Sequence, residues 1–113
     1  MKIISNKQTI KKNNNEACVV TEYNVGDKEL DFAVVKMTGR YPRERRVTNK
    51  ECKEIVYIHE GQGKVEINGK ECKLNAGDLV LIEAEEKFYW EGNMTLFISC
   101  HPAFTIEQHQ EVD

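Results

Sequence analysis

The sequence predicts a single domain of the all-β class, a sandwich or barrel of antiparallel strands. Three observations support this prediction. Short apolar runs follow one another at even spacing from residue 17 almost to the end, with no helical pattern between them. Turn-forming residues separate the runs, most clearly Asn68-Gly69. The chain has 113 residues, which suffices for one hydrophobic core without disulfide bonds.

Clusters of turn-forming residues set the boundaries of the predicted strands. Ahead of the strands, Ser5 is placed to cap a short N-terminal helical segment through "NKQTIKK", which "KNNNE" then ends. One domain is expected over 1–113, with its core at about 17–101 and an irregular tail at 102–113 that has one helical turn after Thr105. We expect strands at residues 17–23, 30–37, 53–60, 64–68, 70–74, 79–84 and 94–100, and a further one in "KFYWEG".

The dipeptide Asn68-Gly69 predicts a tight hairpin. Both central residues of a type I′ turn need a positive φ angle, which asparagine and glycine adopt most readily. Segments 64–68 and 70–74 should therefore pair across this turn. The alternation in the first segment places Val65 and Ile67 on the buried face of the sheet.

Composition excludes several classes of function. The net charge is −3 and the sequence pI is about 5.7, whereas a general nucleic-acid-binding domain has a strongly basic face. No apolar run approaches the roughly 20 residues of a membrane span, and the N-terminus has no apolar stretch of signal-peptide length. We therefore expect a cytoplasmic protein that binds neither nucleic acid nor membrane.

The four cysteines are far apart in the sequence. Because Cys18, Cys52, Cys72 and Cys100 include no C-x-x-C pair, the sequence carries no zinc or redox motif of that type. In a cytoplasmic protein we expect them to be reduced thiols, mostly buried as small apolar side chains.

Residues 53–90 resemble the core of the cupin family of small β-barrels. Glu54 and Gly61 have the spacing of the glutamate and glycine that end the first motif of the family, and Gly77-Asp78 matches the start of the second. The resemblance implies a single-domain, RmlC-like jelly-roll barrel. It also implies a homodimer, since small cupins usually pair through an outer face of the barrel.

The resemblance does not extend to the metal-binding histidines of the family. Of its usual set of three histidines and one carboxylate, only Glu54 is present. A divalent first-row metal needs about three or four converging ligands, so the sequence predicts no metal and no other cofactor. A rearranged site of Cys52, Glu54 and Cys100 remains an alternative. The histidine positions hold Val47 and Asn49, or Thr48 and Lys50, and in the second motif Phe88.

The leading hypothesis for function is a metal-independent cupin that holds an anionic or polar metabolite, such as a carboxylate, phosphate or sugar derivative, at the mouth of the barrel. Four arginines lie within residues 40–46, just before the strand of Glu54, and a guanidinium group can replace the positive charge of a metal. Strand alternation favours Arg40 and Arg46 as the two that point inward. Phe88 and Trp90 would form the apolar wall. The predicted ligand-binding residues are Arg40, Arg43, Arg46, Asn49, Glu54, Phe88 and Trp90.

Two further functions remain open at this point. Glu54, buried in an apolar barrel, would have a raised pKa and could act as the general base of a metal-independent isomerase or epimerase, with Tyr57 or Tyr89 as the acid. Alternatively, the barrel is structural or mediates interactions, and its interior is filled by side chains. The sequence leaves open whether there is catalysis.

Overall fold

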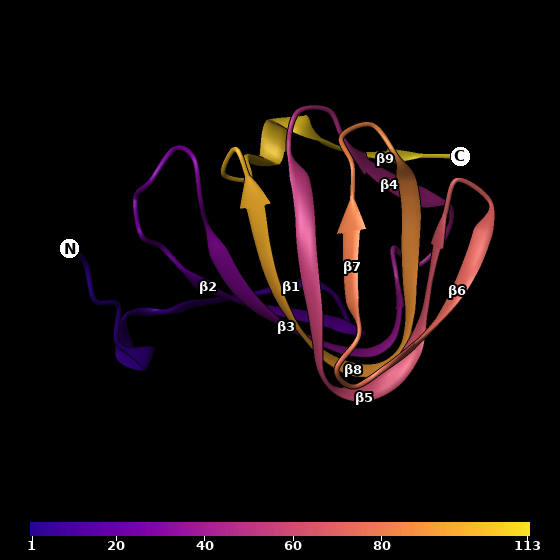
Figure 1. The fold of residues 1–113 in the computed structure, drawn as a ribbon, viewed down its shortest axis with the longest axis horizontal. Coiled ribbons are helices and arrows are strands. Elements are labelled where there is room, and N and C mark those ends of the chain that lie inside the picture. The colour runs from indigo at the N-terminus through magenta and orange to yellow at the C-terminus, as the bar shows by residue number, and fades with distance from the viewer.

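Nine antiparallel strands and two short 3₁₀ turns make up the computed structural model, which describes residues 1–113 (Figure 1). The all-β prediction is therefore confirmed. The turns are η1 (Asn6–Gln8) and η2 (Ile106–Gln108). The strands are β1 (Ile10–Asn15), β2 (Cys18–Tyr23), β3 (Phe32–Tyr41), β4 (Arg46–Asn49), β5 (Lys53–Ile67), β6 (Lys70–Asn75), β7 (Leu79–Ile82), β8 (Lys87–His101) and β9 (His109–Val112).

The long strand β8 lies at the centre of one curled sheet. On one side it pairs with β3 and, at its first residues, with β4, which in turn pairs with β9. On the other side it pairs with β5 along nearly its whole length. Strand β5 then pairs with β7 near its start and with β6 near its end. Figure 1 shows the resulting open barrel, with β1 and β2 extending from one side.

A row of three glycines crosses the sheet where it bends. Gly92 of β8 is in register with Gly39 of β3 and with Gly63 of β5. A Cβ atom added to Gly92 would lie 2.5 Å from the Cα atom of Gly63, so only glycine lets the two backbones approach this closely. Gly63 lies between two predicted strands and Gly92 at the end of another, but in the structure each lies inside a continuous strand. The two strands predicted within residues 53–68 are therefore a single strand, β5, and the two predicted within residues 87–100 are a single strand, β8.

The Asn68-Gly69 hairpin is as predicted. Asn68 and Gly69 have φ angles of 50° and 91°, and β5 and β6 pair on either side of them. Val65 is buried and Ile67 packs against the core cluster, so the predicted face is the buried one. The rest of the core also comes from alternate strand positions, and its most buried members are Met37, Val56, Ile58, Ile82 and Leu96.

Both ends of the chain are more regular than the sequence suggested. The expected N-terminal helix is only the three-residue turn η1, and "KNNN" belongs to β1. Pairing with β2 determines this, because cross-strand hydrogen bonds outweigh the weak helical preference of so short a segment. The turn after Thr105 is confirmed as η2, but the tail is not irregular, since β9 covers the edge of β4.

The outer face of β5, β7 and β8 is apolar. Tyr57 is paired with Leu79 on one side and Phe97 on the other, and the rings of Tyr57 and Phe97 stack with centroids 6.2 Å apart. Ile55 and Leu81 continue this face, and both are exposed. No helix in the structure has the length and hydrophobicity needed to cross a membrane.

The glycine row should be sensitive to a single methyl group. We expect Gly92→Ala to lower the free energy of unfolding by more than about 3 kcal/mol, because the new Cβ meets backbone atoms and Gly92 has a φ of 147°. Gly69→Ala is the matched control. Its φ is also positive but no atom lies within 4 Å, so only about 1 kcal/mol of backbone strain is expected. Urea denaturation measures both; equal losses would contradict the role of close approach.

Candidate functional site

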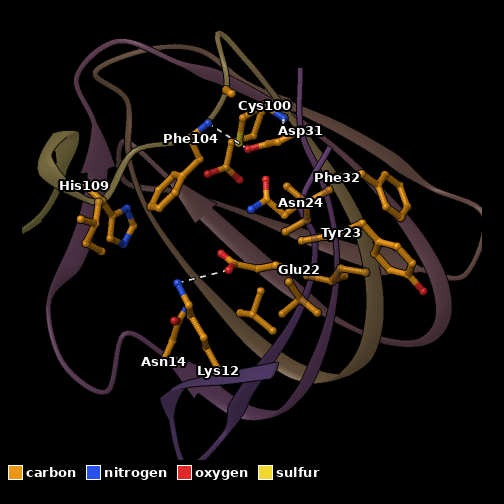
Figure 2. A pocket seen from close by; sticks show the side chains of 18 of the residues that line it. Lys12, Asn14, Glu22, Tyr23, Asn24, Asp31, Phe32, Cys100, Phe104 and His109 are labelled. Carbon is orange, nitrogen blue, oxygen red and sulfur yellow. Dashed lines mark hydrogen bonds and ion pairs between the residues drawn. The ribbon is translucent and has the colours of Figure 1, made fainter. Parts of the chain in front are cut away.

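The barrel contains a cavity of about 580 Å³ that is partly open to solvent. This volume is within the range of roughly 300–1,000 Å³ that is typical of small-molecule sites. Most of its lining is hydrophobic, with Phe88, Trp90 and Phe104 supplying aromatic surface. Figure 2 shows Phe104 and His109 on one side and the Lys12–Glu22 ion pair near the β1–β2 hairpin. The interior is therefore not filled by side chains, which argues against a purely structural barrel.

Glu54 is the buried carboxyl group of this cavity. Strand β5 directs it inward between Ile82 of β7 and Cys100 of β8. Its Oε1 accepts a hydrogen bond of 2.7 Å from Nδ2 of Asn49, whereas Oε2 has no protein partner and is accessible from the cavity. Burial raises the pKa of Glu54 to about 7, and the hydrogen bond from Asn49 opposes this effect.

Asn49 connects Glu54 to a histidine from the end of the chain. Oδ1 of Asn49 lies 2.7 Å from Nδ1 of His109, the first residue of β9. The antiparallel pairing of β4 with β9 places Asn49 directly opposite His109. Asn49 is only 2% exposed, so both of its polar groups are used by these two partners and none is left for solvent.

Tyr41 completes a hydrogen-bonded chain of four side chains. Its hydroxyl lies 2.8 Å from Nε2 of His109, and the two rings are nearly parallel. Burial raises the pKa of Tyr41 to about 12 and lowers the pKa of His109, so both side chains are neutral near pH 7. Tyr41, Glu54 and His109 all line the cavity.

Two of these four residues are predictable from the sequence. Glu54 and Asn49 are at positions given by the motif spacing, and Phe88 and Trp90, which we expected to form the apolar wall of a ligand site, lie in the lining of the cavity. Tyr41 and His109 were missed. The inward position of Tyr41 follows only from its pairing with Trp90, which the sequence does not reveal. His109 lies in the segment that we expected to be an irregular tail.

The arginines lie outside the cavity, so the expectation that one would point toward Glu54 or into the opening is wrong. The reason is strand parity: Tyr41 and Val47, not Arg40 and Arg46, occupy the inward positions of β3 and β4. Arg40 lies over the ring of Tyr89 and donates to the carbonyl groups of Pro42 and Arg45. The others form ion pairs: Arg43 with Glu16, Arg45 with Glu111 and Arg46 with Glu66.

The residues present do not fit the metal of the cupin motifs. Val47 and Phe88 are buried and adjacent in the β4–β8 pairing, as expected for two metal-ligand positions, but neither has a donor atom. Asn49 and Glu54 are bonded to each other. No group of three or more histidine, cysteine, aspartate or glutamate side chains is arranged to hold a metal.

The alternative metal site of Cys52, Glu54 and Cys100 is equally unsuited. The hydrogen bond with Cys52, together with burial, raises the pKa of the Cys100 thiol, whereas a metal binds the thiolate. All four cysteines are free, and three of them are buried, as the sequence indicated.

Known proteins similar to this chain indicate its family and its fold. The family model of the cupin domain matches residues 39–96. No curated protein matches the chain. Among solved structures, Streptomyces Pac13 with uridine is 18% identical with a TM-score of 0.90, and the match covers 100% of this chain and 92% of that one. Pac13 is described as a nucleoside dehydratase.

Two other solved structures are similar over most of their length. KdgF from Halomonas sp. is 14% identical with a TM-score of 0.73, covering 92% of this chain and 96% of that one. An RmlC-like cupin from Shewanella frigidimarina NCIMB 400 is 19% identical with a TM-score of 0.72, covering 91% and 93%. At these identities, the likeness shows the fold.

The buried carboxyl group should make stability depend on pH. Glu54 binds its proton more tightly in the folded state, with a pKa of about 7, than in the unfolded chain, where it is about 4.3. Stability from this group is therefore fully present below about pH 4 and is lost as the pH rises to about 7. At about 1.4 kcal/mol per pKa unit, the loss is on the order of 4 kcal/mol.

Glu54→Gln removes the titration and keeps the shape of the side chain. Relative to this variant, the wild-type protein should lose stability between pH 4.5 and 7.5 in urea denaturation. Comparing the two proteins matters because His109, whose pKa is lowered, contributes in the opposite direction over part of this range. Parallel curves for the two proteins would show that Glu54 does not titrate abnormally.

Proposed function

This chain belongs to the cupin family, and we propose that it binds a small, uncharged, polar metabolite of about nucleoside size inside the barrel, without a bound metal ion. The observation that carries the proposal is the cavity of about 580 Å³, which the unpartnered Oε2 of Glu54 borders. An apolar cavity with a few converging polar groups is the usual form of a small-molecule site.

The charges around the cavity favour an uncharged ligand over the anionic one expected from the sequence. Lys12 is the only lysine or arginine in the lining, and it is paired with Glu22 at 3.2 Å. Both oxygens of Asp31 accept backbone hydrogen bonds. A phosphate or carboxylate would therefore enter the cavity without a free cation to offset its desolvation. The acidic residues of the lining are Glu22, Asp27, Asp31 and Glu54.

The cavity offers matching surfaces to a ring that carries hydroxyl groups. Phe88 and Trp90 contact each other edge to face, with centroids 6.4 Å apart, and form an apolar wall for a flat ring. Glu54 and Tyr41 are polar residues of the same lining. Uridine, bound by the structurally similar Pac13, has this combination of a flat ring and hydroxyl groups, which makes it a suitable first probe.

Trp90, the single tryptophan, is a built-in reporter of binding. In a titration with uridine and other uncharged nucleosides and sugars, we expect at least one compound to change its fluorescence. The 5′-phosphate of the same nucleoside should bind at least about tenfold more weakly, because no free cation lines the cavity. Glu54→Gln should weaken binding by a similar factor, whereas Glu60→Gln, on the exposed part of β5, should not.

Two results would contradict the proposal. One is a panel in which no uncharged compound alters the fluorescence of Trp90. The other is tighter binding of the phosphorylated compound than of its parent, which would restore the anionic ligand suggested by the sequence.

A second candidate function is a metal-independent acid–base enzyme, an isomerase, epimerase or dehydratase. The chain of hydrogen bonds from Tyr41 through His109 and Asn49 to Glu54 favours it, because titratable groups with perturbed pKa values cluster at catalytic sites. The structure changes the roles expected from the sequence: Tyr57 and Tyr89 do not line the cavity, and Tyr41 does.

The exposed apolar face of β5 and β7 is where we place the interface of a homodimer. Leu79 and Leu81 are 61% and 50% exposed beside Tyr57, an unusual density of apolar side chains for a free sheet surface. Light scattering should give twice the chain mass of 13.1 kDa at micromolar concentration. Leu81→Glu should yield monomers, because it buries an unpaired charge at the interface.

Ile10→Glu is the control for the dimer, since Ile10 is similarly exposed but lies on β1, at the other end of the sheet. A monomeric wild-type protein would refute the homodimer. If Leu81→Glu remains a dimer and Ile10→Glu becomes a monomer, the interface lies on the N-terminal strands instead.

A further inference from the structure

The four linked side chains come from four different strands. Tyr41 ends β3, Asn49 ends β4, Glu54 is near the start of β5 and His109 begins β9. The three hydrogen bonds that join them are 2.7 to 2.8 Å long, and all four residues are at least half-buried. Cys18 and Glu111 are the other titratable groups near Tyr41, and neither forms a hydrogen bond with it or with His109.

The donors and acceptors in this chain have one consistent direction. Oε1 of Glu54 accepts, so the amide nitrogen of Asn49 faces it and the amide oxygen faces His109. An oxygen cannot donate there, so Nδ1 of His109 carries a proton. A neutral imidazole has only one proton, which leaves Nε2 as an acceptor. The hydroxyl of Tyr41 must then donate to Nε2, and its lone pairs remain free.

We propose that Tyr41 is a catalytic residue that takes a proton from the bound ligand while its own proton passes to Nε2 of His109, and that Asn49 and Glu54 position His109 for this transfer. This inference rests on the proposed function, since it needs a ligand in the cavity. The X–H bond of the ligand breaks and its electron pair stays on the ligand. The ligand proton bonds to the Tyr41 oxygen, and the former Tyr41 proton converts His109 to an imidazolium.

The relay removes an obstacle that Tyr41 alone would face. A buried phenol whose pKa is about 12 does not lose its proton readily near pH 7. Coupled transfer to His109 avoids a free phenolate, because the hydroxyl is re-formed as the ligand proton arrives. The imidazolium then has both N–H groups satisfied, one by Asn49 and one by Tyr41.

Glu54, which lines the same cavity as Tyr41, can return a proton to the ligand. Below about pH 7 its carboxyl is protonated, and Oε2 is the oxygen that has no protein partner. Transfer of that proton to another atom of the ligand gives an isomer, and transfer to a departing hydroxyl group gives water and an unsaturated product. Either way Glu54 ends as a carboxylate and His109 as an imidazolium, and exchange with water restores both.

The proton position on His109 tests the relay without any ligand. In ¹⁵N-labelled protein, the signals of His109 are identified by their loss in His109→Gln. At a pH where the ring is neutral, we expect the proton on Nδ1 in the wild-type protein and in Tyr41→Phe. Asn49→Leu should lose this preference, because the acceptor for Nδ1–H is gone, whereas Asn49→Asp keeps an acceptor and should retain it.

A proton on Nε2 in the wild-type protein would overturn the relay, since Tyr41 would then accept from His109 and could not pass it a proton. Besides the wild-type spectrum, this decision needs only His109→Gln for the assignment, so it stands even if the Tyr41 and Asn49 variants fail to fold. The role of Tyr41 toward the ligand is tested by uridine binding, followed through Trp90. Tyr41→Phe should weaken binding at least about fivefold, because one hydrogen bond to the ligand is lost, while the proton of His109 stays on Nδ1.

The two tests separate the two proposals. If uridine and the other uncharged probes leave Trp90 unchanged but the proton lies on Nδ1, the ligand assignment fails and the direction of the relay stands. If uridine binds but Tyr41→Phe binds it equally well, Tyr41 does not contact the ligand and its catalytic role is refuted.

Discussion

The row of Gly39, Gly92 and Gly63, in which the backbones of β8 and β5 approach each other closely, is the constraint on which the rest of the structure depends. A flat sheet of β3, β8 and β5 would leave their two halves far apart. Because no side chain separates the strands at this row, the sheet bends there and its halves face each other across the cavity. With the sheet bent, β4 and β9 lie beside the start of β5, so Asn49 bonds both to Glu54 and to His109, which is sixty residues further along the chain.

At the positions where the cupin motifs place metal ligands, this chain has residues that make an apolar contact and a hydrogen bond to each other in place of bonds to a metal. Val47 and Phe88 close one side, and Asn49 bonds to Glu54 on the other. The replacement changes the electrostatics of the cavity. A metal would hold Glu54 ionised, whereas an amide offsets only part of the cost of burying its charge, so its pKa rises toward neutrality. The carboxyl group thus becomes able to release or take up a proton near pH 7.

Turn residues and motif spacing in the sequence predicted those features that depend on a few neighbouring residues. Asn68-Gly69 fixed a hairpin because its φ angles depend on two residues alone. Motif spacing located Glu54 and Asn49. The inward face at residues 40–47 could not be obtained this way, because a shift of one residue exchanges Arg40 for Tyr41, and pairing with Trp90 decides between them. His109 was missed for a related reason: β9 is a strand only because the edge of β4 is available to it.

Asn49, which bonds to Glu54 on one side and to His109 on the other, stabilises the charges that proton transfer creates. Burial shifts the pKa of Glu54 upward to about 7 and that of His109 downward, so near neutral pH His109 is uncharged and Glu54 is about half protonated. Moving a proton through the site creates a carboxylate at one end and an imidazolium at the other. The amide between them points its N–H toward Glu54 and its oxygen toward His109, so its dipole stabilises this pair of charges and opposes the reverse pair. A fixed dipole needs no reorganisation when the charges appear, which is the property that lets a metal-free cavity support proton transfer.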